Sequence, residues 1–217
     1  MTASTSALTT THAPAEGHAR EGGISNVILG MLLFITSEVM FFAGLFAAYF
    51  NVRATAPIWP PADFANKLHW LPTAAQPIPV VTIATILLVT SSATCQLGVW
   101  GIRNGNRTAL VRNIGVTVLL GSIFLLLQAY DYTALYGDGV RLDAGTFGTT
   151  YFTLTGFHGA HVLGGVIMLS VVLYRAMAGQ FSREHHDMVE ATSIYWHFVD
   201  VVWIVLFSTL YIIPNPV

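Results

Sequence analysis

The sequence predicts an all-α integral membrane protein, a bundle of five transmembrane helices, and three observations predict it. Hydrophobic residues make up 54% of the 217-residue chain and charged residues only 9%, whereas a soluble domain carries about 25% charged residues. Five apolar segments reach the roughly 20 residues that a helix needs to cross a bilayer. The connectors between these segments hold the turn-forming residues and most of the charges.

The first three predicted spans are apolar runs bounded by polar or proline-rich connectors. The first, 26–50, contains a single charge, Glu38. A connector with several prolines separates it from the second span, 78–100, which ends just before the polar turn 103–107. The third span, 110–133, follows that turn and ends before a short glycine-containing loop at 136–139. Proline, glycine and asparagine favour turns, so they mark where each span ends.

The last two predicted spans are 150–177 and 192–213, with a charged loop at 182–187 between them. The fourth span carries a ridge of small residues, which favours close contact between membrane helices. This ridge consists of Gly156, Gly159, Ala160, Gly164 and Gly165. Residues 1–23 lack the basic start and apolar core of a signal peptide, and we expect a disordered tail there. Residues 24–217 are then one membrane domain.

The charges predict an orientation and exclude some functions. With the N-terminus inside and the C-terminus outside, inner segments hold Arg20, Arg103, Arg107, Arg112, Arg175 and Arg183, and outer segments hold Arg53, Lys67 and Arg141. This asymmetry follows the positive-inside rule, and it places Trp100 and Trp196 at the inner boundary, where aromatic residues gather.

The net charge of −2 provides no basic footprint for nucleic acid. The single cysteine, Cys95, excludes a disulfide framework.

Ionisable side chains deep within the predicted spans are the candidate site. They are Glu38, His158, His161, His197 and Asp200. A charge at the centre of a bilayer costs at least about 2.5–3.5 kcal/mol, so such groups normally face protein and have a partner. At about 1.5 Å of rise per residue, Glu38 and His161 both lie near the midplane. We therefore predict a direct or water-bridged hydrogen bond between Glu38 and His161.

Three interpretations of this predicted polar cluster stay open on the residues alone. The groups could satisfy one another and lock the bundle together. They could instead line a path for protons, lipid or gas. Finally, His158 and His161 with Glu38 could ligate a metal, but di-iron bundles use Glu-x-x-His motifs, which no span contains. His161 and His197 differ in depth, which disfavours a haem held by two histidines. We predict no catalytic residue and no metal, since no nucleophile–base pair or complete ligand set is visible.

Four strings along the spans carry a family resemblance. They are Ser37-Glu38-Val39-Met40-Phe41-Phe42, Leu127-Gln128-Ala129-Tyr130-Asp131-Tyr132, Gly156-Phe157-His158-Gly159-Ala160-His161-Val162 and Tyr195-Trp196-His197-Phe198-Val199-Asp200-Val201-Val202-Trp203. In this order they resemble subunit III of haem–copper oxidases, over residues 26–213. The chain is similar to the short, five-helix bacterial form of cytochrome c oxidase subunit III. Larger members have seven spans, and the first two form one wall of a lipid-filled cleft.

The resemblance implies an accessory subunit without a redox centre or cofactor of its own. It would dock on oxidase subunit I, which holds haems and copper, alongside subunit II and small subunits. Such a complex, in the bacterial plasma membrane, oxidises cytochrome c, reduces O2 to water and pumps protons. The accessory subunit would stabilise subunit I, bind structural phospholipid, support proton uptake and protect turnover from self-inactivation.

The resemblance also implies roles for particular residues. Glu38 corresponds to the family's buried carboxylate. Arg175 ends the fourth span as the family's headgroup-binding arginine does, although an arginine at a helix end also snorkels without binding a lipid. His185, His186 and Glu190 match the family's inner loop. Histidine exchanges protons near neutral pH, so we hypothesise that this loop buffers protons near the uptake path of subunit I. The alternative is an ordinary solvated loop.

Other functions remain as alternatives. Subunit III of a quinol oxidase is the nearest, but those relatives tend to carry aspartate at position 38 and Glu-x-Tyr-Glu at 128–131. A homologue associated with nitric oxide reductase is another. A stand-alone haem or di-metal membrane enzyme is a more distant alternative, which a Soret band or bound iron in the purified chain would reveal. A small transporter is disfavoured because five spans cannot divide into equal inverted repeats.

Overall fold

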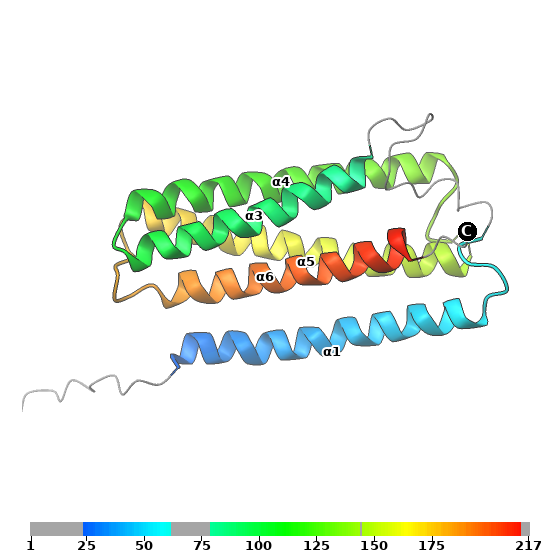
Figure 1. The fold of residues 1–217 in the computed structure, drawn as a ribbon, viewed down its shortest axis with the longest axis horizontal. Helices are drawn as coiled ribbons and strands as arrows, with labels where there is room; N and C mark the ends of the chain where they lie inside the picture. The colour runs from blue at the N-terminus through cyan, green and yellow to red at the C-terminus, as the bar shows by residue number, and fades with distance from the viewer. Residues whose placement is uncertain (1–23, 62–78, 144, 214–217) are drawn as a thin grey trace, which may run out of the picture.

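The computed structural model describes residues 24–61, 79–143 and 145–213, and within these residues the chain forms five long helices (Figure 1). They are α1 (Asn26–Thr55), α3 (Val80–Arg103), α4 (Arg107–Gly137), α5 (Thr146–Met177) and α6 (Asp187–Phe207), and α6 continues into a π-helical turn, η1 (Ser208–Ile212). All five are long and apolar enough to cross a membrane. The predicted all-helical fold is confirmed, while the orientation of its termini stays a prediction. The predicted tail, 1–23, lies outside the described residues.

Most of the helices extend beyond the spans predicted from hydropathy. The backbone of α1 continues to Thr55, and α6 begins at Asp187 rather than at 192. Apolar composition marks only the part of a helix that lies in hydrocarbon, whereas backbone hydrogen bonding continues into the polar interface. Capping side chains stabilise the N-terminal ends of two of these helices. Ser25 accepts a hydrogen bond from Ile28 N–H at the start of α1, and Asn106 accepts one from Ala109 N–H at the start of α4.

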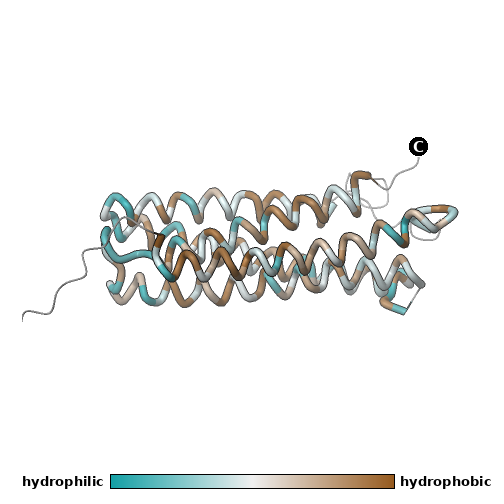
Figure 2. Tube along the Cα trace, turned by 90° about the horizontal axis from the view of Figure 1, so that it is seen from below, coloured by the Kyte–Doolittle hydropathy of each residue, from teal (hydrophilic) through white to brown (hydrophobic). Residues whose placement is uncertain are grey.

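Four of the helices form a closed ring, and α1 lies outside it. Contacts run from α3 to α4, from α4 to α5, from α5 to α6 and from α6 back to α3, while α1 packs on α6 and α5. Figure 1 shows α1 along one side of the others. Of its side chains only Phe42 and Tyr49 are buried. Figure 2 shows hydrophobic residues along the helices and hydrophilic residues gathered at the end where the chain enters α1.

Trp196 of α6 sits at the centre of the ring. Its side chain is fully buried, and its indole N–H donates to the Ser91 hydroxyl of α3 at 3.0 Å. A Cβ on Gly121 of α4 or on Gly165 of α5 would lie 2.7 Å from an indole carbon. The indole therefore occupies space that two glycines leave open, and it joins all four ring helices. Trp196 therefore faces the interior of the bundle and is not part of a lipid-facing aromatic belt, while its depth in the membrane stays a prediction.

The predicted small-residue ridge of α5 makes close contact over only part of its length. Gly165 meets Trp196, and a Cβ on Gly164 would lie 3.5 Å from the Tyr195 hydroxyl. A Cβ on Gly159 would meet nothing within 4 Å, and one on Gly156 only the Tyr132 hydroxyl at 3.9 Å. The stretch of α5 around Gly156 and Gly159 is thus not tightly packed against other described residues.

Candidate functional site

Glu38 of α1 and His161 of α5 form a contact between two helices deep within the spans. The Glu38 Oε2 and His161 Nε2 atoms lie 2.8 Å apart, and the two side chains are 18% and 16% exposed. The other ring nitrogen of His161, Nδ1, lies 2.7 Å from the Phe157 carbonyl oxygen. The predicted hydrogen bond between Glu38 and His161 is therefore present.

The hydrogen-bond partners of His161 determine that one proton lies between its Nε2 atom and the Glu38 carboxyl group. A carbonyl oxygen only accepts, so Nδ1 carries a hydrogen and donates it to Phe157. The contact at Nε2 then requires one proton between the imidazole and the carboxyl group. Either the imidazolium donates to a carboxylate, or a protonated Glu38 donates to a neutral imidazole. The contact between Nε2 and Oε2 thus shares a single proton, which either partner can carry in this geometry.

Aromatic side chains surround this pair and tie it to a third helix. The ring centroids of Phe42 and His161 lie 5.0 Å apart, and those of Phe41 and His161 lie 6.1 Å apart. The Tyr195 hydroxyl of α6 donates to the His161 carbonyl oxygen at 3.0 Å. The Glu38–His161 contact therefore joins α1 to the ring at its seam with α5 and α6, where α1 has few buried side chains of its own.

The remaining residues of the predicted polar cluster do not join this pair. His158 is fully buried, its ring stacks on Trp203 with centroids 4.9 Å apart, and neither ring nitrogen has a hydrogen-bond partner among the described residues. His197 contacts Gln96 Oε1 at 3.2 Å. Asp200 Oδ1 is buried and has no hydrogen-bond partner within the described part of the chain. The single, mutually satisfied network is therefore wrong as a description of all five residues.

Helix geometry explains why His158 and His161 separate. Two residues that are three apart on an α-helix point about 60° apart around its axis. On α5 this angle is enough to direct His161 toward α1 and His158 toward Phe124 of α4 and Trp203 of α6. Two side chains with this spacing can therefore contact different neighbouring helices, because other helices pack on more than one side of α5.

No set of metal ligands converges in the part of the chain that the structure describes. There, no three histidine, cysteine, aspartate or glutamate side chains lie close enough together to hold a metal ion. Glu38 and His161 contribute only two such groups, and His158 points away from them. The absence of a metal in this chain stays a prediction from the residue types present.

The other predicted site residues lie where the α5–α6 loop meets α6: His185 and His186 are in the loop, and Glu190 is in the first turn of α6. Glu190 Oε1 lies 2.8 Å from Arg103 Nε and 3.0 Å from His186 Nε2, so it bridges the α3–α4 turn and the loop. His185 is exposed, and its backbone N–H donates to the Ser182 hydroxyl. His186 and His185 therefore differ, because only His186 belongs to an ionic cluster.

Arg175, the predicted lipid contact, makes several contacts within the chain. Its Nε donates to Gln180 Oε1 at 2.7 Å, and its Nη1 lies 2.8 Å from the Met188 sulfur. The guanidinium carbon also lies 5.1 Å from the centre of the Phe181 ring. These contacts hold the guanidinium beside the loop. A role toward lipid phosphate stays a prediction.

Arg107 is a structural residue that sequence reasoning missed. Its Nε donates to the Ala176 carbonyl oxygen at 2.7 Å and its Nη2 to that of Met177. These carbonyls end α5, where the helix dipole favours a positive charge. The sequence marks Arg107 as a charge in a turn, but it does not show which distant carbonyls the side chain reaches.

Comparison with known proteins gives the family. The chain matches the family model described as cytochrome c oxidase subunit III over residues 9–214. It is 40% identical to cytochrome c oxidase subunit 3 of Corynebacterium diphtheriae over 190 residues, covering 86% of this chain and 88% of the relative. It is 38% identical to that of Synechocystis sp. over 213 residues, covering 98% and 86%, and 37% identical to that of Scyliorhinus canicula over 202 residues, covering 90% and 73%.

Helices of this length and composition, together with these relatives, define a multi-pass membrane protein. The chain belongs to the cytochrome c oxidase subunit III family. The resemblance that the four sequence strings indicated is confirmed.

Proposed function

We propose that this chain is a non-redox accessory subunit of a haem–copper oxidase that oxidises cytochrome c, reduces O2 to water and pumps protons. The family match over residues 9–214 carries this proposal. Members of the family work within an oxidase complex, so the partners are the oxidase subunits that hold haem and copper. In this proposal electron transfer belongs to those partners.

The proposal includes an orientation and a location. Arginines gather at the end where α3 and α5 finish, namely Arg103, Arg107, Arg112, Arg175 and Arg183. Within the described residues, the opposite end carries Arg53 and Arg141. The positive-inside rule then supports an arginine-rich inner side in a bacterial plasma membrane, with the N-terminus inside. On that side, Arg175 would face lipid phosphates of the inner leaflet.

The Glu38–His161 pair supports a structural role toward subunit I. It anchors α1, the helix least buried within the chain, to the ring. A carboxyl group that is unpaired at this depth would be costly, so the pair holds α1 in one position and presents a fixed surface to partners. We propose that this fixed surface stabilises subunit I.

The end of the α5–α6 loop, with His185 and His186, together with Glu190 in the first turn of α6, is the proposed proton-buffering surface. It lies at the arginine-rich end, where the proposed orientation places the cytoplasm. Histidine side chains exchange protons near neutral pH. His185 is exposed, whereas the His186 side chain is mostly covered and contacts the Glu190 carboxylate. Such a surface would supply protons to a neighbouring uptake path during rapid turnover.

One experiment on the purified oxidase tests both parts of this proposal. Complexes with and without this chain are compared for initial oxygen consumption and for the number of turnovers completed before activity is lost. We expect similar initial rates but a several-fold shorter catalytic lifetime without the chain. An unchanged lifetime would contradict the accessory role.

In the same assay, a complex with both His185→Gln and His186→Gln is expected to lose rate at the alkaline side of its pH profile, and an unchanged profile would remove the buffering role.

A quinol oxidase is the second candidate for the complex. Position 38 is glutamate and residues 128–131 read Gln-Ala-Tyr-Asp, which favours the cytochrome c pattern over the quinol pattern. The named relatives are also cytochrome c oxidase subunits. Oxygen consumption by the same purified complex with reduced cytochrome c, but not with a quinol, is the outcome that separates the two.

A further inference from the structure

We infer that an ordered water molecule binds inside the helix ring, between His158 of α5 and Gln128 of α4. The two residues are 1% and 7% exposed, respectively. Both ring nitrogens of His158 and the side-chain nitrogen of Gln128 are buried and have no hydrogen-bond partner among the described residues. The inference concerns the core of the chain itself, so it goes beyond the proposed oxidase role and does not depend on it.

His158 and Gln128 lie at one level of the seam between α4 and α5. The Tyr132 hydroxyl of α4 donates to the Thr155 hydroxyl of α5 at 2.6 Å, and this contact gives the register of the two helices. On α4, Gln128 lies four residues before Tyr132. On α5, which runs antiparallel to α4, His158 lies three residues after Thr155. At about 1.5 Å of rise per residue, His158 and Gln128 therefore differ in depth by only about 1.5 Å.

The two residues also face each other across this seam. Phe124 lies one turn from Gln128 on the same face of α4, since residues four apart on a helix are neighbours. The ring centroid of Phe124 lies 6.0 Å from that of His158. Because Gln128 shares this face and is buried, its side chain lies on the side of α4 that packs against His158.

The aromatic neighbours of His158 leave its nitrogen atoms without a partner. Trp203 of α6 stacks on the imidazole, with ring centroids 4.9 Å apart and 28° between the ring planes. Hydrogen bonds to imidazole nitrogens lie near the ring plane, so a ring stacked on the face does not supply one. The Trp203 N–H is also directed elsewhere, because it donates to the Thr85 hydroxyl at 2.9 Å. The polar edge of His158 therefore needs a different partner.

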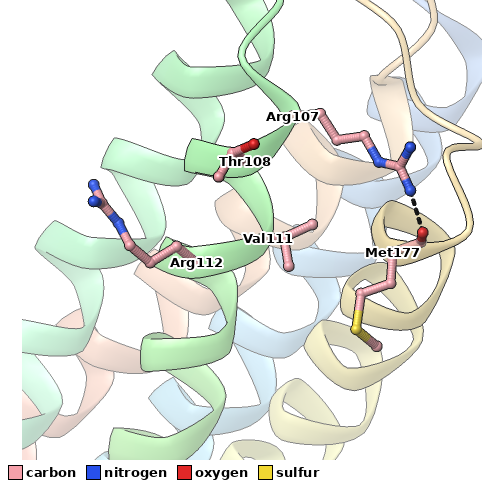
Figure 3. A pocket seen from close by; sticks show the side chains of 5 residues that line it. All are labelled: Arg107, Thr108, Val111, Arg112 and Met177. Carbon is pink, nitrogen blue, oxygen red and sulfur yellow. Dashed lines mark hydrogen bonds between the residues drawn. The ribbon is translucent and has the colours of Figure 1, made fainter.

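Polar side chains at other levels of the same seam have partners within the chain. Where α5 ends, Arg107 of α4 donates to the Met177 carbonyl oxygen (Figure 3). Toward the opposite end, Tyr132 and Thr155 bond to each other. A buried polar group that is left unsatisfied costs about 1–3 kcal/mol. The unpartnered groups at the level of His158 thus point to a bound molecule at that level.

The hydrogen-bonding groups select water as this molecule. In its neutral form an imidazole offers one donor and one acceptor, and the Gln128 nitrogen offers only donors, so the bound molecule must both donate and accept. A neutral imidazole and an amide do not compensate a charge, which makes an inorganic ion costly in the core. Protein interiors are close-packed, and a water with two to four polar partners is what they accommodate. It would link α4 to α5 through hydrogen bonds that the two side chains do not make with each other.

The test is hydroxyl-radical footprinting of the full chain in its purified complex, with X-rays producing the radicals and mass spectrometry locating the oxidised residues. Radicals formed from a bound water oxidise the side chains beside it, even where bulk water does not reach. We expect Trp203 to be oxidised several-fold faster than Trp196. Both tryptophans are fully buried, but only Trp203 stacks on His158.

A variant of Gln128 assigns this oxidation to the proposed site. Gln128→Leu removes one partner of the water and should reduce Trp203 oxidation several-fold without changing that of Trp196. Leu135→Ile is the matched control, because it conserves volume at another buried position of α4 and should leave both tryptophans as they are.

Two footprinting results would overturn the inference. Equal oxidation of Trp203 and Trp196 would show that the level of His158 is dry, and Trp203 oxidation that Gln128→Leu does not change would place the water elsewhere. If Gln128→Leu does not assemble, a density map of the unaltered complex that resolves ordered waters decides the question. A peak within about 3.2 Å of both side chains supports the site, and its absence contradicts it. Neither readout uses oxygen consumption, so failure of the water site is distinguishable from failure of the oxidase assignment.

Discussion

Gly165→Ala is expected to destabilise the bundle by about 1–3 kcal/mol, the usual cost of forcing an extra methyl group into a packed core. The new Cβ would lie 2.7 Å from Trp196 Cε3 and 2.8 Å from Cζ3. The indole cannot easily move away, because its N–H is bonded to Ser91 and its other edge lies against Gly121. Gly121→Ala should have a similar cost, since its Cβ would meet Trp196 Cη2 at 2.7 Å. Unfolding in a denaturing detergent, followed by circular dichroism, measures both effects.

Gly159→Ala on the same helix is the matched control for this prediction. Its Cβ would meet nothing within 4 Å, and alanine favours a helix over glycine. Stability should therefore be unchanged or slightly higher. If Gly159→Ala and Gly165→Ala cost the same, the loss would come from the backbone of α5 and not from contact with Trp196. Trp196 would then not be the residue that joins the four ring helices.

Glu38→Ala is expected to cost about 1.5–3 kcal/mol, the range for a hydrogen bond to a charged group. The substitution leaves His161 Nε2 without its partner between Phe41 and Phe42, in a seam that water reaches poorly. Glu38→Gln should cost less, because an amide can still hydrogen-bond to the imidazole. Detachment of α1 or of the whole subunit should appear before any slowing of electron transfer in the complex.

A double-mutant cycle isolates the Glu38–His161 contact from other effects of the substitution. Glu38→Ala, His161→Ala and the double variant are compared, and a coupling energy of about 0.6–1.7 kcal/mol is expected within a membrane. Met40→Ala is the control on α1, because the Met40 side chain is 72% exposed and truncating it should have little effect. Additive costs for Glu38 and His161 would show that their proximity contributes nothing to stability.

Hydropathy and depth predicted the helices and the Glu38–His161 pair. They did not predict which neighbouring helix each side chain contacts. The five spans follow from apolar length, which depends only on local sequence. The pair follows from two ionisable groups at one depth, each of which needs a partner. The direction of His158 depends on a rotation of about 60° around α5 and on which helices surround it, and hydropathy shows neither. As a result, the Glu38–His161 pair was predicted correctly, whereas a single network of all five polar residues was not found.

The position of Trp196 shows a second limit of the sequence. A tryptophan near the start of a span usually marks the membrane boundary. Here Gly121 and Gly165, which are distant in sequence, leave a space of the right shape in the core. Ser91, on a third helix, supplies the acceptor that a buried indole N–H needs. Each of these residues is ordinary alone, and only their convergence in the fold distinguishes a core tryptophan from a boundary one.

The most direct test of the central claim is affinity purification of the tagged chain from its own membranes in a mild detergent. We predict that it co-purifies in a fixed ratio with chains that carry haem and copper, and that the complex consumes oxygen with reduced cytochrome c. After separation from those chains, this polypeptide should show no Soret band and no bound iron or copper. Recovery of the chain alone, or with haem or metal bound to it, would contradict an accessory subunit that leaves electron transfer to its partners.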